Sequence, residues 1–203
     1  MRIPTFILHL TLLATVTLAS SAVPAFAGVE PALPTTMQIT EQDITHQLDL
    51  TGTAERSFLF FHVYDIAHYA ESAGPVPFSP DAVIEDGPAK ALRITFARKL
   101  GVERIRDEFA KTLRRNARPQ WLADAEQTIA AFIAAIDRDT RAGDQFALYW
   151  LAGGRVRAEF NGERAFAATD TAFAKLLWSI WFGADPVCDR EQLLARWPRA
   201  MAL

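Results

Sequence analysis

Two polar side chains with useful chemistry, Arg56 and Tyr64, lie on a long apolar and aromatic stretch at residues 52–69. A buried guanidinium or phenol hydroxyl needs hydrogen-bond partners from the protein, from water or from a ligand. Together the two groups can bind an acidic head group through charge-assisted hydrogen bonds, while the neighbouring aromatic residues suit an apolar tail. The stretch therefore gives a first indication of a pocket.

The composition of this stretch predicts one uninterrupted strand, Arg56–Tyr69. With the two-residue period of a strand, one face carries Phe58, Phe60, His62, Tyr64, Ile66 and His68. The other face is also largely apolar, so we expect the strand to lie deep in a domain. His62 and His68 would be roughly 20 Å apart on it, too far to share a metal ion. The alternative is that Arg56 is solvated at the strand end and that Tyr64 is a core residue bonded to the backbone.

Other chemical motifs are missing from the sequence. It has no Gly-rich phosphate loop, no nucleophile elbow and no His-Glu-x-x-His motif. Cys188 is the single cysteine, so neither an intrachain disulfide nor a Cys/His zinc cluster is expected. We therefore expect no metal and no cofactor, and the residue pattern by itself assigns no catalytic residue.

The N-terminus predicts export from the cytoplasm. Arg2 is the only charged residue among the first 27, and an apolar run follows it. Residues 25–27 read Ala-Phe-Ala, a pattern that signal peptidase cleaves. We expect residues 1–27 to be a signal peptide that is cleaved after Ala27. A membrane anchor is the alternative, which small polar residues in the second half of the segment disfavour.

The remaining composition describes a mildly acidic domain. The chain has 21 Lys and Arg against 24 Asp and Glu, a net charge of −3, and loss of Arg2 makes it one unit more negative. Such a domain has no general attraction for nucleic acid. We expect residues 28–44 to form a leader and first extended segment, and residues 45–203 a single domain without a stable membrane span. A disulfide-free exported protein suits a bacterial periplasm. The composition gives no indication of oligomeric state.

Alternating apolar residues and turn signals predict strands at residues 45–50, 56–69, 92–96, 145–151, 155–160 and 163–168. Asn161-Gly162 is a strong hairpin signal between the last two. Apolar stripes predict helices at residues 102–113 and 122–136, from an Asp170 cap to Gly183, and at residues 191–197. Strands joined by hairpins, with helices grouped into two blocks, predict an α+β fold in which an antiparallel sheet packs against a helical layer.

Several short motifs occur in a specific order: Gly52-x-x-x-Arg56, Phe61-x-Val-Tyr-Asp-Ile-Ala-x-Tyr69, Leu92-Arg-Ile-Thr-Phe96, Gly143-Asp144, Asn161-Gly162 and Ile180-Trp-x-Gly183. This order resembles that of the chalcone isomerase-like proteins, specifically their secreted bacterial branch. The resemblance covers about residues 45–194. It implies an open-faced β-sandwich in which a curved antiparallel sheet packs against helices, in agreement with the pattern of elements.

The resemblance also implies roles for individual residues. Chalcone isomerases use an arginine to stabilise the negative charge that develops during ring closure, and Arg56 matches this arginine. A threonine on the long strand of these enzymes falls on Tyr64, as it does in the fatty-acid-binding branch, where an arginine and a tyrosine hold a carboxylate. Ser179 falls near a polar ligand contact on the last helix. For Ser179 the alternative is a hydrogen bond to its own helix.

One part of the isomerase pattern has no match in this chain. The enzymes carry a tyrosine and an asparagine seven residues apart on the helix after the strands. One register places Arg104 and Lys111 at these positions, and the other places Phe109 and Asn116 there. Neither register supplies the tyrosine, which disfavours isomerase catalysis.

Three functions therefore remain open. The first is a non-catalytic periplasmic binding protein for a fatty acid or similar apolar carboxylate, with Arg56 and Tyr64 as its head-group site. The second is an isomerase or intramolecular lyase of the chalcone isomerase type. The third is an accessory module that binds another protein and has a vestigial pocket. A filled interior between sheet and helices would favour the third.

Overall fold

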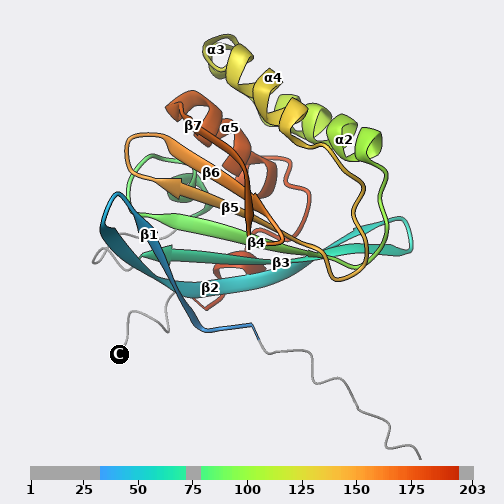
Figure 1. Ribbon diagram of the computed structural model, residues 1–203, viewed down its shortest axis with the longest axis horizontal. Helices are drawn as coiled ribbons and strands as arrows, with labels where there is room; N and C mark the ends of the chain where they lie inside the picture. The colour runs from blue at the N-terminus through green and yellow to red at the C-terminus, as the bar shows by residue number, and fades with distance from the viewer. Residues whose placement is uncertain (1–32, 72–78, 197–203) are drawn as a thin grey trace, which may run out of the picture. The chain divides into compact units, whose positions relative to one another are not determined.

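One seven-stranded antiparallel sheet forms the frame of the domain, and its strands lie in chain order (Figure 1). The computed structural model describes residues 33–71 and 79–196, so the expected signal peptide at residues 1–27 lies outside the described residues. The strands are β1 (Thr36–Glu41), β2 (Ile44–Phe58), β3 (Phe61–Glu71), β4 (Lys90–Phe96), β5 (Gln145–Leu151), β6 (Arg155–Phe160) and β7 (Glu163–Thr169). Because each strand pairs with the next, the sheet is built from hairpins and from longer connections that leave it and return.

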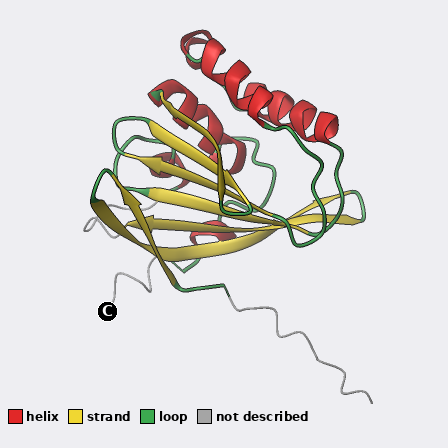
Figure 2. Ribbon diagram, in the orientation of Figure 1, coloured by secondary structure: helices red, strands yellow, loops and turns green. Residues whose placement is uncertain are grey.

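The helices that follow β4 and β7 pack on one side of this sheet (Figure 2). The helical elements are α1 (Pro80–Val83), α2 (Val102–Arg115), α3 (Pro119–Asp124), α4 (Glu126–Ala135), α5 (Thr171–Phe182) and a 3₁₀ turn, η1 (Gln192–Leu194). None of the described helices is long and apolar enough to cross a membrane. A curved antiparallel sheet with a helical layer confirms the predicted α+β fold and the open-faced β-sandwich.

Apolar cores lie on both faces of the sheet. The larger one, between sheet and helices, contains the buried residues Trp150, Trp178 and Trp181. Burying a large apolar side chain stabilises a fold by about 1.5 to 3 kcal/mol, so this core contributes much of the stability. Leu48 and Tyr69 belong to the smaller core on the opposite face. The sheet therefore has no fully solvated face, which is why its central strands are apolar at nearly every position.

The predicted single strand Arg56–Tyr69 is wrong. It is the end of β2 and most of β3, joined by a two-residue turn at Leu59 and Phe60. Leu59 adopts a φ of 57° there, a conformation that turns usually assign to Gly or Asn. The turn carries none of the residues that signal one, so the apolar run concealed it. The prediction that the whole stretch lies deep in the domain is also wrong, because the end of this hairpin is exposed.

Most of the remaining elements confirm the predictions. Asn161 and Gly162 both have positive φ values, 49° and 83°, as a tight hairpin turn between β6 and β7 requires. The Asp170 side chain caps α5 by accepting a hydrogen bond from the Phe173 amide at 2.9 Å. Two details differ. The predicted helix at residues 122–136 is divided at Ala125 into α3 and α4, and the predicted terminal helix is only η1 within the described residues.

Candidate functional site

The C-terminal segment crosses β2 at Gly52, four residues before the candidate site residue Arg56. A side-chain carbon at Gly52 would lie 2.1 Å from the carbonyl oxygen of Gln192, so only glycine leaves room for this crossing. The hydroxyl of the preceding residue, Thr51, donates a hydrogen bond of 2.7 Å to the Leu193 carbonyl and holds the segment in place. The glycine four residues before Arg56 in the sequence motif therefore has a structural purpose.

Arg56 and Tyr64 lie directly opposite each other on β2 and β3. Directly paired residues project from the same face of a sheet with Cβ atoms about 5 Å apart, and both side chains line the same cavity. Arg56 Nη1 donates a hydrogen bond of 2.8 Å to the Val187 carbonyl. This bond fixes the guanidinium, which has five N–H donors, and leaves others for an anion. Arg56 is therefore a positioned cation and not a freely solvated strand end.

Trp181 orients the hydroxyl of Tyr64. Its indole Nε1 donates a hydrogen bond of 3.1 Å to the phenol oxygen, and the Trp181 side chain is almost fully buried. Burial raises the pKa of the Tyr64 phenol well above its ordinary value, so the hydroxyl stays protonated. Because the oxygen accepts from Trp181, its own proton remains to be donated, and no acceptor for it lies among the described residues. The Tyr64 hydroxyl is thus available to donate to a ligand oxygen.

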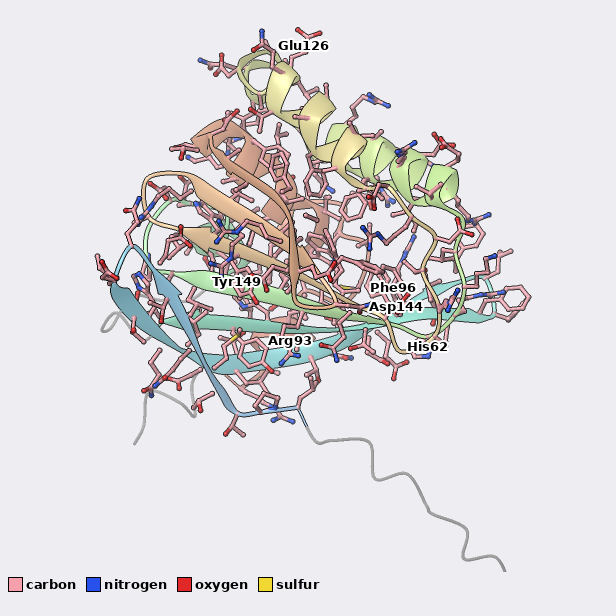
Figure 3. The ribbon with its side chains drawn as sticks, in the orientation of Figure 1. His62, Arg93, Phe96, Glu126, Asp144 and Tyr149 are labelled. Carbon is pink, nitrogen blue, oxygen red and sulfur yellow. The ribbon has the colours of Figure 1, made fainter. Side chains whose placement is uncertain are left out.

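The cavity that these residues line has a volume of about 440 Å³ and lies between the β2–β4 part of the sheet and α2. This volume falls in the range of roughly 300 to 1,000 Å³ that is typical of small-molecule sites. Figure 3 shows Phe96 of β4 on the helix side of the sheet and Arg93 on the opposite side. The apolar lining comes from β2, β3, β4, α2, α5 and the segments beside them: Phe58, Leu59, Phe61, Val63, Ile94, Phe96, Leu100, Ile105, Phe109, Ile180, Trp181 and Val187.

A β-bulge in β3 adjusts the wall beside Tyr64. The pairing passes from Arg56 with Tyr64 to Ser57 with His62, so Val63 is an extra residue in β3. A bulge changes the direction of successive side chains. As a result Val63 and Tyr64, although adjacent in the chain, both line the cavity. The bulge also explains why the expected alternation from Phe58 to His68 fails at this end of the stretch.

A second cavity of about 210 Å³ adjoins the first and extends under α4. The two cavities share Phe96, Ile105 and Phe109 as lining residues. The Phe109 ring lies 5.3 Å from that of Phe132 and 6.4 Å from that of Trp181, measured between ring centroids. Phe109 therefore stands between the two cavities as a partition.

The charges around the larger cavity favour an anionic group. Its lining includes Arg56, Arg98, Lys99 and Arg104 but only one carboxylate, that of Glu108. Lys99 is paired with Asp139 at 3.2 Å. Cationic groups that line an apolar cavity attract a ligand with an acidic head. In the described part of the chain, no group of three or more His, Cys, Asp or Glu side chains is placed to hold a metal ion.

Ser179, the third residue expected at the site, has a different position. It is buried in α5, its hydroxyl donates a hydrogen bond of 2.6 Å to the Leu176 carbonyl, and it lines neither cavity. This is the bond to its own helix that the sequence left as the alternative. Cys188 lies closer to the pair, and burial raises the pKa of its thiol to about 12. The thiol therefore stays protonated at neutral pH.

The helix α2 does not supply the isomerase pair. Arg104 and Phe109 line the cavity, whereas Lys111 is exposed. Asn116 connects α2 to the segment after α5: its Nδ2 donates to the Asp185 carbonyl at 2.9 Å, and its Oδ1 accepts from the Asp185 amide at 2.8 Å. In both registers the cavity receives no tyrosine and no asparagine from this helix.

The sequence analysis did not select Trp181 as a site residue. It is buried, but its indole nitrogen binds Tyr64, which lies 117 positions away in the chain. The Val187 carbonyl that holds Arg56 was also missed, because any residue can supply a backbone carbonyl. No local sequence signal could have identified either contact.

Comparison with known proteins supports the observed fold. The sequence pattern of a family described as chalcone isomerase-like matches residues 25–194. Among solved structures, a fatty-acid binding protein from Arabidopsis thaliana is similar, with a TM-score of 0.64 and 13% sequence identity over 82% of this chain and 100% of that chain. At this identity the likeness concerns the fold. No curated protein matches the sequence.

Proposed function

Because the chain belongs to the chalcone isomerase-like family, we propose that it is a non-catalytic binding protein for a fatty acid or a similar apolar carboxylate. One observation carries the proposal: Arg56 and Tyr64 face each other across two paired strands and line an otherwise apolar cavity. The similar plant structure, described as a fatty-acid binding protein, supports the same ligand class.

The geometry supports separate binding regions for the carboxylate head group and for the apolar tail of the ligand. The Arg56 guanidinium, held by the Val187 carbonyl, donates charge-assisted hydrogen bonds to one or both carboxylate oxygens. The Tyr64 hydroxyl, oriented by Trp181, donates to the same carboxylate. The apolar tail then lies along the Phe-rich wall of the cavity, where its burial supplies about 0.8 kcal/mol per methylene.

The isomerase alternative has less support. Ring closure requires groups aimed at a developing oxyanion and at the phenol that attacks. Arg56 could serve the first purpose, but α2 presents Phe109 and Arg104 to the cavity in place of the tyrosine and asparagine of the enzymes. The accessory-module alternative expects a filled interior, whereas the sheet and helices line a cavity of about 440 Å³.

The proposed setting is the bacterial periplasm or the space outside the cell. Its support is the N-terminal pattern of Arg2, an apolar run and Ala25-Phe-Ala27. Mass spectrometry of the intact protein recovered from a bacterial expression host tests the cleavage, which is expected after Ala27. A protein that retains Met1 and stays in the cytoplasm would contradict the proposed location.

The binding function is tested by mass spectrometry of small molecules released when the natively purified protein is denatured. We expect a stoichiometric fatty acid or similar amphiphile. In Arg56→Ala, affinity for an added fatty acid should fall by about 2 kcal/mol, roughly thirtyfold, because one charge-assisted hydrogen bond in a partly buried site is lost. Arg93→Ala is the matched control, since Arg93 lies on the opposite face of the sheet and binds Gln145. Equal affinities in Arg56→Ala and the wild type would refute the head-group assignment.

A further inference from the structure

The end of the β2–β3 hairpin carries four consecutive exposed apolar residues, here called the aromatic tip. Their exposed fractions are 47% for Phe58, 75% for Leu59, 99% for Phe60 and 56% for Phe61. Figure 1 shows this hairpin reaching past the neighbouring strands, below the first turn of α2. Apolar residues exposed singly are common, but four in succession at a projecting end indicate a binding surface.

The backbone of the aromatic tip is not explained by folding stability. Leu59, at the first position of the two-residue turn, has a φ of 57°, where a β-turn usually has glycine. A large exposed side chain in a conformation that is strained for it gains no packing in return. Strained positions of this kind commonly serve function.

Three cationic side chains lie beside the base of the aromatic tip and are here called the collar: Arg98, Lys99 and Arg104. The guanidinium of Arg98 lies 4.8 Å from the ring centroid of Phe61, and that of Arg104 lies 5.7 Å from the ring centroid of Phe58. Lys99 lies next to Arg98, although Asp139 pairs with it. Two carboxylates lie at the same register on the hairpin, Glu55, which is exposed, and Asp65, which is paired with His62 at 3.0 Å. This arrangement matches the surface of an anionic bilayer. The apolar tip can reach the apolar chains while the basic collar stays at the level of the anionic head groups.

The aromatic tip is continuous with the candidate ligand site. Phe58, Leu59 and Phe61 line the larger cavity together with the collar residues Arg98, Lys99 and Arg104, whereas Phe60 is not among its lining residues. A bilayer that receives the tip therefore also meets the rim of the cavity. An amphiphile could then pass between bilayer and cavity without crossing water, which costs free energy for every exposed methylene.

We propose that the aromatic tip inserts into an anionic lipid bilayer, with Arg98 and Arg104 at the level of the lipid phosphates. A protein partner fits the surface less well. Taking roughly 200 Å² per large apolar residue, the tip exposes roughly 500 Å², which is below the roughly 800 Å² per partner of a standard protein interface. A narrow hairpin end is also the wrong shape for a flat protein surface, whereas it can enter the head-group region to a depth of about 5 to 10 Å.

Co-sedimentation with vesicles tests the inference. The wild-type protein is mixed with vesicles of phosphatidylcholine alone or of phosphatidylcholine with phosphatidylglycerol, at low and high salt. We expect stronger binding to the anionic vesicles and weaker binding at high salt, because the collar attracts anionic head groups. Phe60→Ser should weaken binding to the anionic vesicles about tenfold or more, since it removes the most exposed ring.

The control variant is Ile44→Ser, which changes another exposed apolar residue at the opposite end of β2. It should bind vesicles as the wild type does. Failure of the wild type to bind either vesicle, or equal binding of Phe60→Ser and wild type, would overturn the inference. A change of oligomeric state in Phe60→Ser, without wild-type vesicle binding, would assign the tip to a second copy of the chain and would also overturn it.

This inference and the proposed function fail separately. Phe60→Ser leaves the lining of the cavity intact, so it should retain the affinity of the wild type for an added fatty acid in detergent-free solution. Arg56→Ala should lose that affinity but should still bind anionic vesicles, because Arg56 belongs neither to the aromatic tip nor to the collar. Vesicle binding without fatty-acid binding would leave the inference standing and reject the proposed ligand.

Discussion

The burial of the His68 imidazole leads us to predict a loss of folding stability at acidic pH. The side chain is fully buried, and its ring packs edge-on against Phe182 at 4.8 Å between centroids. Its Nδ1 lies 2.7 Å from the Thr51 hydroxyl, which also lies 2.7 Å from the Leu193 carbonyl oxygen and 3.1 Å from the His68 carbonyl oxygen. Burial, with a smaller effect from the nearby Lys90, lowers the pKa of His68 from 6.5 to about 3.

The sign follows from the protons bound in each state. Between pH 6.5 and about 3 the unfolded chain holds a proton on His68 and the folded protein does not, so falling pH favours unfolding. The contribution of His68 is fully present above pH 6.5 and falls by about 1.4 kcal/mol for each pH unit below it. At a pH about two units below the ordinary pKa, the free energy of unfolding should be lower by about 3 kcal/mol on this account.

Urea denaturation over a pH series measures this effect. His68→Phe keeps a planar ring beside Phe182 and leaves the Thr51 hydroxyl bonded to Leu193. The variant can be more or less stable than the wild type at neutral pH, but its stability should decline less steeply on acidification because the titrating group is absent. The carboxylates of the protein titrate in the same way in the wild type and in the variant. The difference between their two slopes of unfolding free energy against pH therefore reports His68 alone. Parallel slopes would refute the assignment of a neutral buried imidazole.

Two further predictions concern the crossing at β2 and the partition between the cavities. Gly52→Ala should destabilise the protein by about 1 to 3 kcal/mol in urea denaturation, because the added carbon would clash with the Gln192 carbonyl. Gly87→Ala is the control and should change stability little, because the space around Gly87 is open. Equal stabilities of the two variants would contradict the close crossing. Phe109→Ala should join the two cavities, lower stability by about 3 kcal/mol and shift the preferred fatty acid to longer chains in calorimetric titrations. An unchanged chain-length preference would show that the smaller cavity is not used.

Local patterns in the sequence were sufficient for much of the fold. Alternation and the Asn161-Gly162 turn predicted β5, β6 and β7 to within a residue or two, because a tight turn with positive φ values leaves a composition signal. The Asp170 cap and the Gly183 stop predicted α5 for the same reason. The β2–β3 hairpin was missed because its turn at Leu59 and Phe60 uses apolar residues, which are not the residue types that signal a turn.

For the candidate site, the contributions of the sequence and of the tertiary structure are easier to separate. Sequence alone selected Arg56 and Tyr64, since polar groups in an apolar aromatic stretch are rare and need partners. On the predicted single strand the two residues would have been separated by roughly 26 Å.

Only the tertiary structure placed them face to face, because the turn between β2 and β3 folds the stretch back and strand pairing sets the register. The other features of the site also depend on contacts between residues that are far apart in the chain. Trp181 and the Val187 carbonyl reach the pair from distant parts of the chain, and the cavity exists because α2 and α5 pack over the sheet. Residue types thus determined which groups needed partners, and the packing of distant segments determined which partners they received.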